Sequence, residues 1–402
     1  MAINPRSLLD QLRYPHACFT ALRESGPILY DERLKVWEVF NYEDVRALLA
    51  NHELFSSDNY RFAPEPVIEE RDSSIINTDP PLHRQLRNLV SQAFTPRAIN
   101  QLAPRIAEIT NELLDAVIER GSMDIIGDLA GALPIIVIAE MLGIPSSDRV
   151  QFKRWSDAIV ISEYENIKPE NFEAYREQMR RTVRSTLDDI YCYFKDIVAE
   201  RRRAPGSDLI SALLASEIDG VRLPERDILS FAALLLVAGN ITTTNLLGDA
   251  LLCFDEHPEV MERLKHEPQL IPSAIEEVLR YRSPVTMIAR YATQDTELAG
   301  RTVPRGAFIL GWVSSANHDP AQFPEPERFD IERTPNRHLS FGHGIHFCLG
   351  APLARLESHI ALTILFERLQ DIRRIHAEEL ETIHSTFIYG PRQLPIAFTA
   401  RL

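Results

Sequence analysis

A ten-residue stretch near the C-terminal end, Phe341 to Gly350, places the tightest constraint on how this chain can fold. It carries one cysteine, Cys348, among three glycines, and a helical apolar pattern follows from Ala351. Glycines at this density allow a backbone that curls tightly and approaches a flat partner without a side-chain clash. A cysteine just before a helix start lies where the helix dipole and free N–H groups favour the thiolate. The stretch therefore predicts a backbone nest that presents one anionic sulfur to a metal.

The order of residues in this stretch is specific as well. A lone cysteine is more often an inert core residue, and a glycine-rich loop is more often a simple turn. Neither alternative accounts for the complete order Phe-Gly-x-Gly-x-His-x-Cys-x-Gly. That order resembles the haem-ligand loop of the cytochrome P-450 family at every defined position. The resemblance implies haem b as the cofactor and Cys348 as its axial thiolate ligand, with Phe341, Gly342 and Gly350 beside the haem.

Composition and charge argue against several classes of protein. The formal net charge of -15 disfavours nonspecific binding to nucleic acid, whose phosphates would repel the chain. The N-terminal residues lack the apolar core of a signal peptide, and the longest apolar run, 228–239, is too short to span a bilayer. We therefore expect a soluble, cytoplasmic monomer. Four widely spaced cysteines without a CxxC pair disfavour a disulfide framework or a zinc site: Cys18, Cys192, Cys253 and Cys348.

Helical patterns dominate the middle of the chain, and short strand patterns flank them. Residues 97–216 are helical almost without pause, with an amphipathic segment at 98–120 and a richly apolar one at 124–142 that breaks near Pro134. These patterns predict a mainly α protein with small β-sheets (α+β). Strands are expected at 36–40, 285–292, 301–303 and 308–313, and further helices at 42–50, 271–281 and 352–369.

The resemblance extends this fold class to a specific architecture. It implies the cytochrome P-450 fold as a single domain over residues 1–402, with a small β-rich N-terminal part and a large helical part. The haem would lie between a long central helix and the cysteine loop. Two stretches are expected to be loops that choose the substrate: residues 56–76, which have no clear period, and residues 160–175, where Pro169 interrupts a helix near the substrate entrance.

Residues 224–256 predict the long central helix, which ends at His257. Its stretch 234–239 is apolar all round, so we expect it to be buried on every side. Ala238 is small enough to let a flat cofactor lie against the backbone, and the threonines that follow can bond back to helix carbonyls. A plain core helix with threonines on a polar flank is the alternative.

The resemblance identifies this helix as the one that crosses the distal haem face. It implies that Thr242 helps to deliver protons during oxygen activation. The family usually carries Asp or Glu just before this threonine, whereas this chain has Ile241. Because an isoleucine cannot relay protons, either Asn240, Thr243 and ordered water do so, or oxygen activation is slower and leakier.

A short helix after residue 78 carries two cationic side chains on one face. Thr78 or Asp79 can cap it, and Pro80 can occupy its first turn. His83 and Arg87 are four residues apart and could grip one anionic group together, although a solvated basic face has the same pattern. The resemblance implies that this pair holds a haem propionate, that Arg290 is another propionate ligand and that His346 is a further candidate.

Glu277 and Arg280 are three apart on the helix expected at 271–281, so their side chains can pair. Such pairs are common on protein surfaces and stabilise little there. The family keeps Glu-x-x-Arg at this place, bonded to an arginine of a later Pro-Glu-Arg-Phe stretch, which this chain supplies at 326–329. The resemblance therefore implies a buried structural triad of Glu277, Arg280 and Arg328.

The implied function is that of a haem-thiolate monooxygenase that hydroxylates or epoxidises a hydrophobic small molecule such as a steroid, terpenoid, fatty acid or macrolide. It would use O2 and two electrons from NAD(P)H, delivered by a ferredoxin and its reductase or by a flavodoxin. We expect four apolar residues to contact the substrate: Val285, Met287, Ile288 and Ile388. A mildly basic segment is a candidate docking site for an acidic partner: Arg333, Arg337, His338, His343 and Arg355.

Two alternatives stay open. A peroxygenase on the same scaffold would use hydrogen peroxide, and the missing acid at Ile241 motivates it, while the retained Thr242 argues against it. A non-enzymatic haem protein, such as a gas sensor or carrier, would bind the same cofactor without forming a product.

Overall fold

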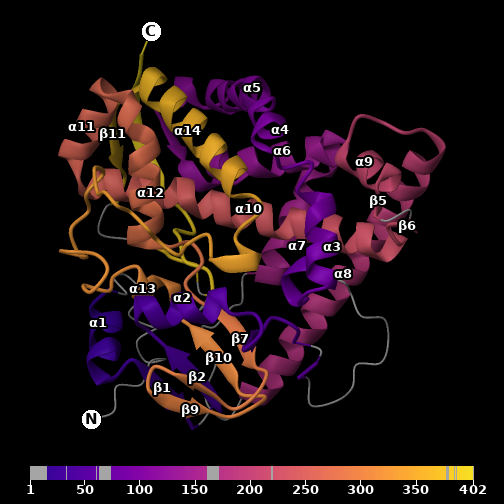
Figure 1. Cartoon of the computed structure of the whole chain (residues 1–402). Coiled ribbons are helices and arrows are strands. Elements are labelled where there is room, and N and C mark those ends of the chain that lie inside the picture. The colour runs from indigo at the N-terminus through magenta and orange to yellow at the C-terminus, as the bar shows by residue number, and fades with distance from the viewer. Residues whose placement is uncertain are drawn as a thin grey trace. The chain divides into compact units, whose positions relative to one another are not determined.

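The computed structural model describes residues 16–32, 34–59, 61–62, 74–160, 172–218, 221–376, 380–383, 385 and 387–401. Helices make up most of these residues and the strands form small sheets (Figure 1), which confirms the predicted fold class. The chain forms two compact units, and the expectation of a single domain stays a prediction. The first unit comprises Met1–Arg71, Ile76–His83 and Asp249–Ala351, and the second comprises Asp72–Ile75, Arg84–Gly248 and Pro352–Leu402.

A five-stranded sheet with the order β1-β2-β10-β7-β3 organises the first unit. Its strands pair antiparallel except β10 and β2, which run parallel. In the register, Ile309 of β10 lies opposite Trp37 on one side and Arg290 on the other. The helix α2 (Tyr42–Ala50) covers this sheet with Val45 and Leu48, both fully buried. Arg290 therefore lies on β7, next to the central strand β10 of the sheet.

The other elements of the first unit surround this sheet. Its strands are β1 (Ile28–Asp31), β2 (Val36–Val39), β3 (Phe55–Ser56), β7 (Ile288–Ala292), β8 (Thr296–Leu298), β9 (Arg301–Val303) and β10 (Phe308–Gly311). Its remaining helices are α1 (His16–Ser25), α11 (Pro258–His266), α12 (Ile271–Arg282) and α13 (Val313–Ala316), with single 3-10 turns at η7 (Pro268–Leu270) and η8 (Gly344–His346).

The second unit is mainly helical. Its helices are α4 (Pro96–Asn100), α5 (Ala103–Asp115), α6 (Ala132–Met141), α7 (Arg149–Val160), α8 (Phe172–Arg203) and α9 (Leu209–Ala215), with a π-helical segment at η4 (Ile125–Ala130). Its strands are β4 (Ser122–Asp124), β5 (Glu217–Ile218), β6 (Val221–Arg222), β11 (Leu369–Arg374) and β12 (Pro395–Ala400). Three helices have residues in both units: α3 (Leu82–Val90), α10 (Glu225–Glu256) and α14 (Ala351–Arg368).

The central helix forms as predicted, because α10 spans Glu225–Glu256 without interruption. Within 234–239, the protein's own residues leave Ala238 exposed, so they do not bury this stretch on every side. An apolar sequence shows that a face can be buried, but it does not show what buries it. Of the described residues, α10 alone is long and apolar enough to cross a membrane, and 67% of its most apolar window is buried inside the protein, as in an ordinary core helix.

Several boundaries differ from those predicted. The break expected at Pro134 occurs at Gly131, and Pro134 lies in the first turn of α6, where its missing N–H costs no hydrogen bond. The amphipathic segment 98–120 divides into α4 and α5, and the latter ends at Asp115. The strand expected from 285 starts at Ile288, because the carbonyl of Thr286 accepts a hydrogen bond from the Ser314 amide instead. Pro169 and most of the loop at 56–76 lie outside the described residues.

Candidate functional site

The cysteine loop is closed by its own backbone. The amide of Cys348 donates to the carbonyl of Phe341 at 2.8 Å, and the amide of Phe347 donates to the carbonyl of Gly344 at 3.1 Å. Gly342 and Gly344 have φ angles of 73° and 72°, in the left-handed region that favours glycine. The loop therefore turns twice within a few residues and brings Cys348 three residues before the start of α14, as predicted.

One of the glycines is needed for space as well. A Cβ at Gly344 would lie 2.8 Å from the carbonyl oxygen of Leu49 at the end of α2, so a side chain there would push the loop off that helix. A Cβ at Gly350 would lie 4.0 Å from the Sγ atom of Cys348. That distance is an ordinary van der Waals contact, so the space around the sulfur does not itself require glycine at position 350.

Two of the predicted cations, both in the first unit, contact each other at this loop. The rings of His83 and His346 are in contact, with centroids 4.3 Å apart. His83 is 2% exposed and lies in the first turn of α3, and Arg87 follows one turn later on the same helix. The side chain of Asp79 does not cap this helix, because its carboxylate accepts from the amide of Ser57 at 3.0 Å and from the hydroxyl of Ser56.

Arg290 is a buried cation. Its side chain is 8% exposed, and burial lowers the pKa of its guanidinium to about 10, although the charge of Asp79 acts in the opposite direction. The Nη1 atom donates to the carbonyl of Ala289 at 2.8 Å. Within the described part of the chain, no carboxylate lies within ion-pair distance of this guanidinium. A buried charge of this kind is costly unless an anion accompanies it, so Arg290 is suited to bind one.

The helix α10 presents a narrow accessible stripe of small residues. Ala238 is exposed and Thr242 is partly exposed, one turn apart, and the hydroxyl of Thr242 donates to the carbonyl of Ala238 at 2.8 Å. Asn240 and Thr243 are buried and point to other sides of the helix, since they are two and five residues from Ala238. The structure therefore does not bring these two predicted relay residues onto the stripe of Thr242.

These features agree with the comparisons between this chain and known proteins. A sequence model of one family, described as "Cytochrome P450", matches residues 15–387. The chain belongs to the cytochrome P450 family. It is 41% identical to the putative cytochrome P450 YjiB of Bacillus subtilis (strain 168) over 94% of this chain and 92% of that protein.

Other members of the cytochrome P450 family have more specific names. The chain is 40% identical to the erythromycin C-12 hydroxylase of Saccharopolyspora erythraea, over 93% of this chain and 92% of that one. The crystal structure of CYP109E1 from Bacillus megaterium in complex with testosterone matches with a TM-score of 0.89 and 40% identity, covering 98% of this chain and 99% of that one. Cytochromes P450 are haem-thiolate monooxygenases that use haem b.

The residues of this cytochrome P450 fit that cofactor. The loop offers one sulfur, at Cys348, in a turn held by two left-handed glycines, Gly342 and Gly344. A propionate would supply the anion that buried Arg290 lacks among the described residues. The accessible stripe of Ala238 and Thr242 breaks an otherwise buried helix with small side chains, as a planar cofactor requires.

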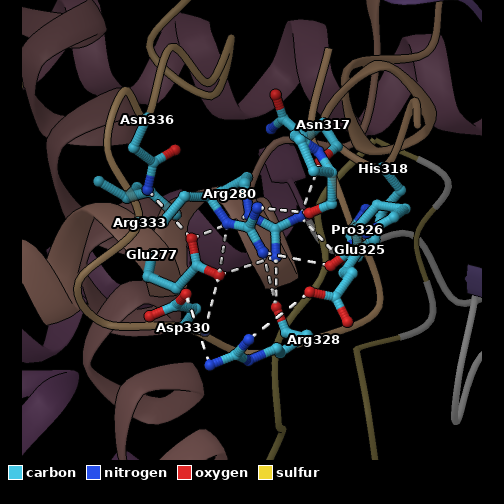
Figure 2. Close-up of polar contacts among 12 residues, drawn as sticks. Glu277, Arg280, Asn317, His318, Glu325, Pro326, Arg328, Asp330, Arg333 and Asn336 are labelled. Carbon is cyan, nitrogen blue, oxygen red and sulfur yellow. Dashed lines mark hydrogen bonds and ion pairs between the residues drawn. The ribbon is translucent and has the colours of Figure 1, made fainter. Parts of the chain in front are cut away.

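The predicted buried pair of Glu277 and Arg280 is confirmed. Both side chains are 0% exposed, and Arg280 donates to the two Glu277 oxygens at 2.8 and 2.9 Å (Figure 2). The guanidinium also donates to the carbonyls of Asn317 and Pro326, both at 2.9 Å. It thereby ties α12 to two later segments of the first unit that lead towards the cysteine loop.

The third member of the triad is Arg333, and the prediction of Arg328 was wrong. The Arg328 guanidinium is 62% exposed and faces Glu325 and Asp330, and only its main-chain carbonyl accepts from Arg280 (Figure 2). Arg333 is 9% exposed, and its Nε donates to Glu277 at 3.2 Å. The amide of Asn336 donates to the other Glu277 oxygen at 3.1 Å. The Pro-Glu-Arg-Phe motif predicted Arg328 as the third member. Only the three-dimensional path of the chain after Phe329 identifies Arg333 as the partner of Glu277.

Two residues of the predicted basic docking segment already contact carboxylates of this chain. Arg333 is engaged with Glu277, and the side chain of His338 is 4% exposed and contacts Glu276 at 3.1 Å. Neither side chain is available to an acidic partner. Arg337 remains exposed.

The four expected substrate contacts fall in different parts of the protein. Val285, Met287 and Ile288 are partly buried in the first unit, where Met287 packs against the cluster that contains Phe40 and Trp312. Ile388 is 1% exposed in the second unit.

Proposed function

We propose that this cytochrome P450 hydroxylates or epoxidises a hydrophobic small molecule, with Cys348 as the axial ligand of haem b. The observation that carries the proposal is the closed cysteine loop, which presents Cys348 before a helix start and is supported by left-handed glycines. When bound through a cysteine thiolate, haem b supplies activation of O2 and insertion of one oxygen atom into the substrate.

The side chains around the site have separate tasks. Arg290, His83 and His346, with Arg87, bind the propionates, and the loop residues Phe341, Gly342 and Gly350 hold the cysteine edge of the ring. Ala238 leaves room for the ring on α10. The hydroxyl of Thr242 donates a hydrogen bond to the carbonyl of Ala238. The same hydroxyl can rotate and donate instead to a group that lies against the accessible stripe of Ala238 and Thr242.

The substrate is expected to be apolar and bulky. Val285, Met287, Ile288 and Ile388 offer only apolar contacts. One related structure contains testosterone and one relative is named erythromycin C-12 hydroxylase, so steroids and macrolides are the first classes to test, ahead of terpenoids and fatty acids. Electrons would reach a cytoplasmic monomer from NAD(P)H through a ferredoxin and its reductase, or a flavodoxin.

A substrate screen followed by turnover tests the proposal. Purified haem-loaded protein is titrated with steroids and macrolides while the haem absorption spectrum is followed for a low-spin to high-spin shift. Compounds that produce the shift are then incubated with NAD(P)H, ferredoxin and ferredoxin reductase, and the products are analysed by mass spectrometry. A product heavier by one oxygen atom supports the proposal, and spin shifts without any oxygenated product would contradict it.

One observation favours a second candidate, a peroxygenase on the same fold. Ile241 is 5% exposed at the position where the family usually carries an acid. Turnover of the same compounds with hydrogen peroxide alone, at a rate that the electron-transfer proteins do not exceed, would favour this candidate. A gas sensor or carrier would form no product under either condition.

A further inference from the structure

The side chain of Asn317 lies where three segments of the first unit meet. It is the C-cap residue of α13 and is 0% exposed. Its Oδ1 atom accepts from the amide of Leu339, and its Nδ2 atom donates to the hydroxyls of Ser283 and Ser340, each at 2.8 Å. Because the Leu339 amide can only donate, it fixes which end of the carboxamide is the oxygen. One side chain therefore joins the end of α12, the end of α13 and the approach to the cysteine loop.

The hydroxyls of Ser283 and Ser340 depend on Asn317 for their connection. Ser340 donates to the carbonyl of Leu279 at 2.6 Å. Ser283 donates to the carbonyls of Leu279 and Arg280, at 3.2 and 3.3 Å. Each hydroxyl has a single hydrogen, so no hydrogen remains to bridge the 3.4 Å between their two oxygens. The Nδ2 group supplies one hydrogen to each oxygen, so the two segments are joined through Asn317.

The hydrogen bonds of Asn317 continue through the backbone to Cys348. The carbonyl of Leu339 accepts from the amide of Gly342 at 2.7 Å, and the carbonyl of Phe341 accepts from the amide of Cys348 at 2.8 Å. Leu339 is 3% exposed and belongs to the apolar core around the five-stranded sheet. Asn317 therefore holds the chain immediately before the loop closes on itself.

The segment that begins at Ser283 leads to other residues of the site. Ser283 is buried and has a φ angle of 45°, a left-handed conformation that is uncommon for serine. A backbone of this kind persists only where the surrounding contacts hold it, and the hydrogen bond from Asn317 is one of these contacts. The chain continues into residues 285–290, which include three of the expected substrate contacts and Arg290. The residue that holds the cysteine loop thus also holds the start of this segment.

The main chain of Asn317 adds a link to the buried Glu277–Arg280 pair, because its carbonyl accepts from Arg280 at 2.9 Å (Figure 2). We propose that Asn317 is a positioning residue for Cys348, whose carboxamide fixes the start of the cysteine loop against the segment that begins at Ser283. This inference rests on the proposed ligation of haem b by Cys348. Hydrogen bonds behind a metal ligand fix its orientation, and their loss weakens the bond to the metal.

The first test measures how firmly the sulfur is held. Haem-loaded protein is reduced under CO, and the loss of the red-shifted ferrous–CO band is followed at a temperature where circular dichroism shows every variant folded. Asn317→Ala should lose the band about tenfold faster than wild type, because it removes three hydrogen bonds before the loop. Leu264→Ala leaves a hole in the buried part of α11, in the same unit, and should change the rate by less than about twofold.

Two failures can be told apart in this experiment. A wild-type protein without the red-shifted band would contradict the ligation of haem by Cys348. A wild-type band together with equal rates of loss in Asn317→Ala and Leu264→Ala would overturn only the positioning role, because both variants would then act through general destabilisation.

The second test asks whether the two segments are joined through Asn317. Ser283→Ala and Ser340→Ala each remove one hydroxyl and keep a Cβ, so they remain usable if Asn317→Ala fails to fold. Each should speed loss of the band about threefold, and Ser283→Ala should add nothing in the Asn317→Ala background. Amide hydrogen exchange in residues 339–348, followed by mass spectrometry, should accelerate in all three variants and not in Leu264→Ala. Unchanged band loss in both serine variants, or a full additional effect of Ser283→Ala on top of Asn317→Ala, would overturn the proposal.

Discussion

The Nε atom of Arg333 lies 3.2 Å from an oxygen of Glu277, a residue that precedes it by 56 positions. The same carboxylate accepts from Arg280, Asn336 and the main-chain amide of Asp330. Because Glu277 is completely buried, each of these donors compensates part of the cost of removing its charge from water. The cluster fixes the segment that leads from α12 to the cysteine loop.

Arg333 and Arg328 should therefore differ sharply on substitution. Arg333→Ala removes a buried donor from Glu277 and should lower the free energy of unfolding by about 2–3 kcal/mol. Arg328→Ala removes an exposed side chain and should change it by less than about 0.5 kcal/mol. Urea unfolding followed by circular dichroism measures both. A larger loss in Arg328→Ala than in Arg333→Ala would contradict the assignment.

Arg290 should have opposite effects on the apoprotein and on haem retention. Arg290→Met removes a buried cation without an ion-pair partner among the described residues, so the apoprotein should become more stable, by about 1 kcal/mol. The same change should speed haem loss to a scavenger protein, because a propionate loses its counter-ion. Arg301→Met, at an exposed arginine of the same unit, should do neither. A less stable apoprotein together with normal haem retention would show that Arg290 serves only the fold.

Cys348→Ala should abolish the red-shifted absorption band of the ferrous–CO complex, since no other sulfur is presented by the loop. Cys192→Ala is the control, because Cys192 is exposed on α8. Optical difference spectra of the reduced proteins measure the band. If the band persisted in Cys348→Ala, another residue would have to be the ligand.

Thr242→Ala should lower the amount of product formed per NAD(P)H consumed several-fold, whereas Thr242→Ser should preserve it because the hydroxyl is kept. Ile241→Asp, which restores the acid usual in the family, should raise this ratio if proton delivery limits the enzyme. Product and NAD(P)H are quantified in the same reaction. Equal ratios in wild type and Thr242→Ala would exclude a role in proton delivery.

Asp249 should make the protein less stable as the pH rises. Burial raises the pKa of its carboxyl to about 8, so the folded state keeps a proton that the unfolded state releases above pH of about 4. Its stabilising effect is complete below that pH and is lost as the pH rises towards 8, by at most about 1.4 kcal/mol per pH unit. Asp249→Asn should reduce this dependence, as measured by urea midpoints at several pH values.

Glu357 should behave in the same way and independently. Burial also raises the pKa of its carboxyl to about 8, and it lies on α14 in the second unit. Glu357→Gln should therefore flatten a further part of the same pH range, and the two variants together should flatten more than either alone. A wild-type protein whose stability did not fall between pH values of about 5 and 8 would contradict both assignments.

The amino-acid sequence by itself determined the features that depend on neighbouring residues. Glycine spacing determines the turns around Cys348, and a continuous apolar run determines α10, because both follow from local backbone preferences and helix periodicity. The fold class and the family followed from the same local patterns.

Only the tertiary structure decided which distant side chains meet. Glu277 selects Arg333 rather than Arg328 because the chain turns after Phe329 and directs one arginine inwards and the other to solvent. Ala238 is accessible although its sequence neighbourhood is apolar. Burial is a property of the packed neighbours, and a helix sequence does not contain those neighbours.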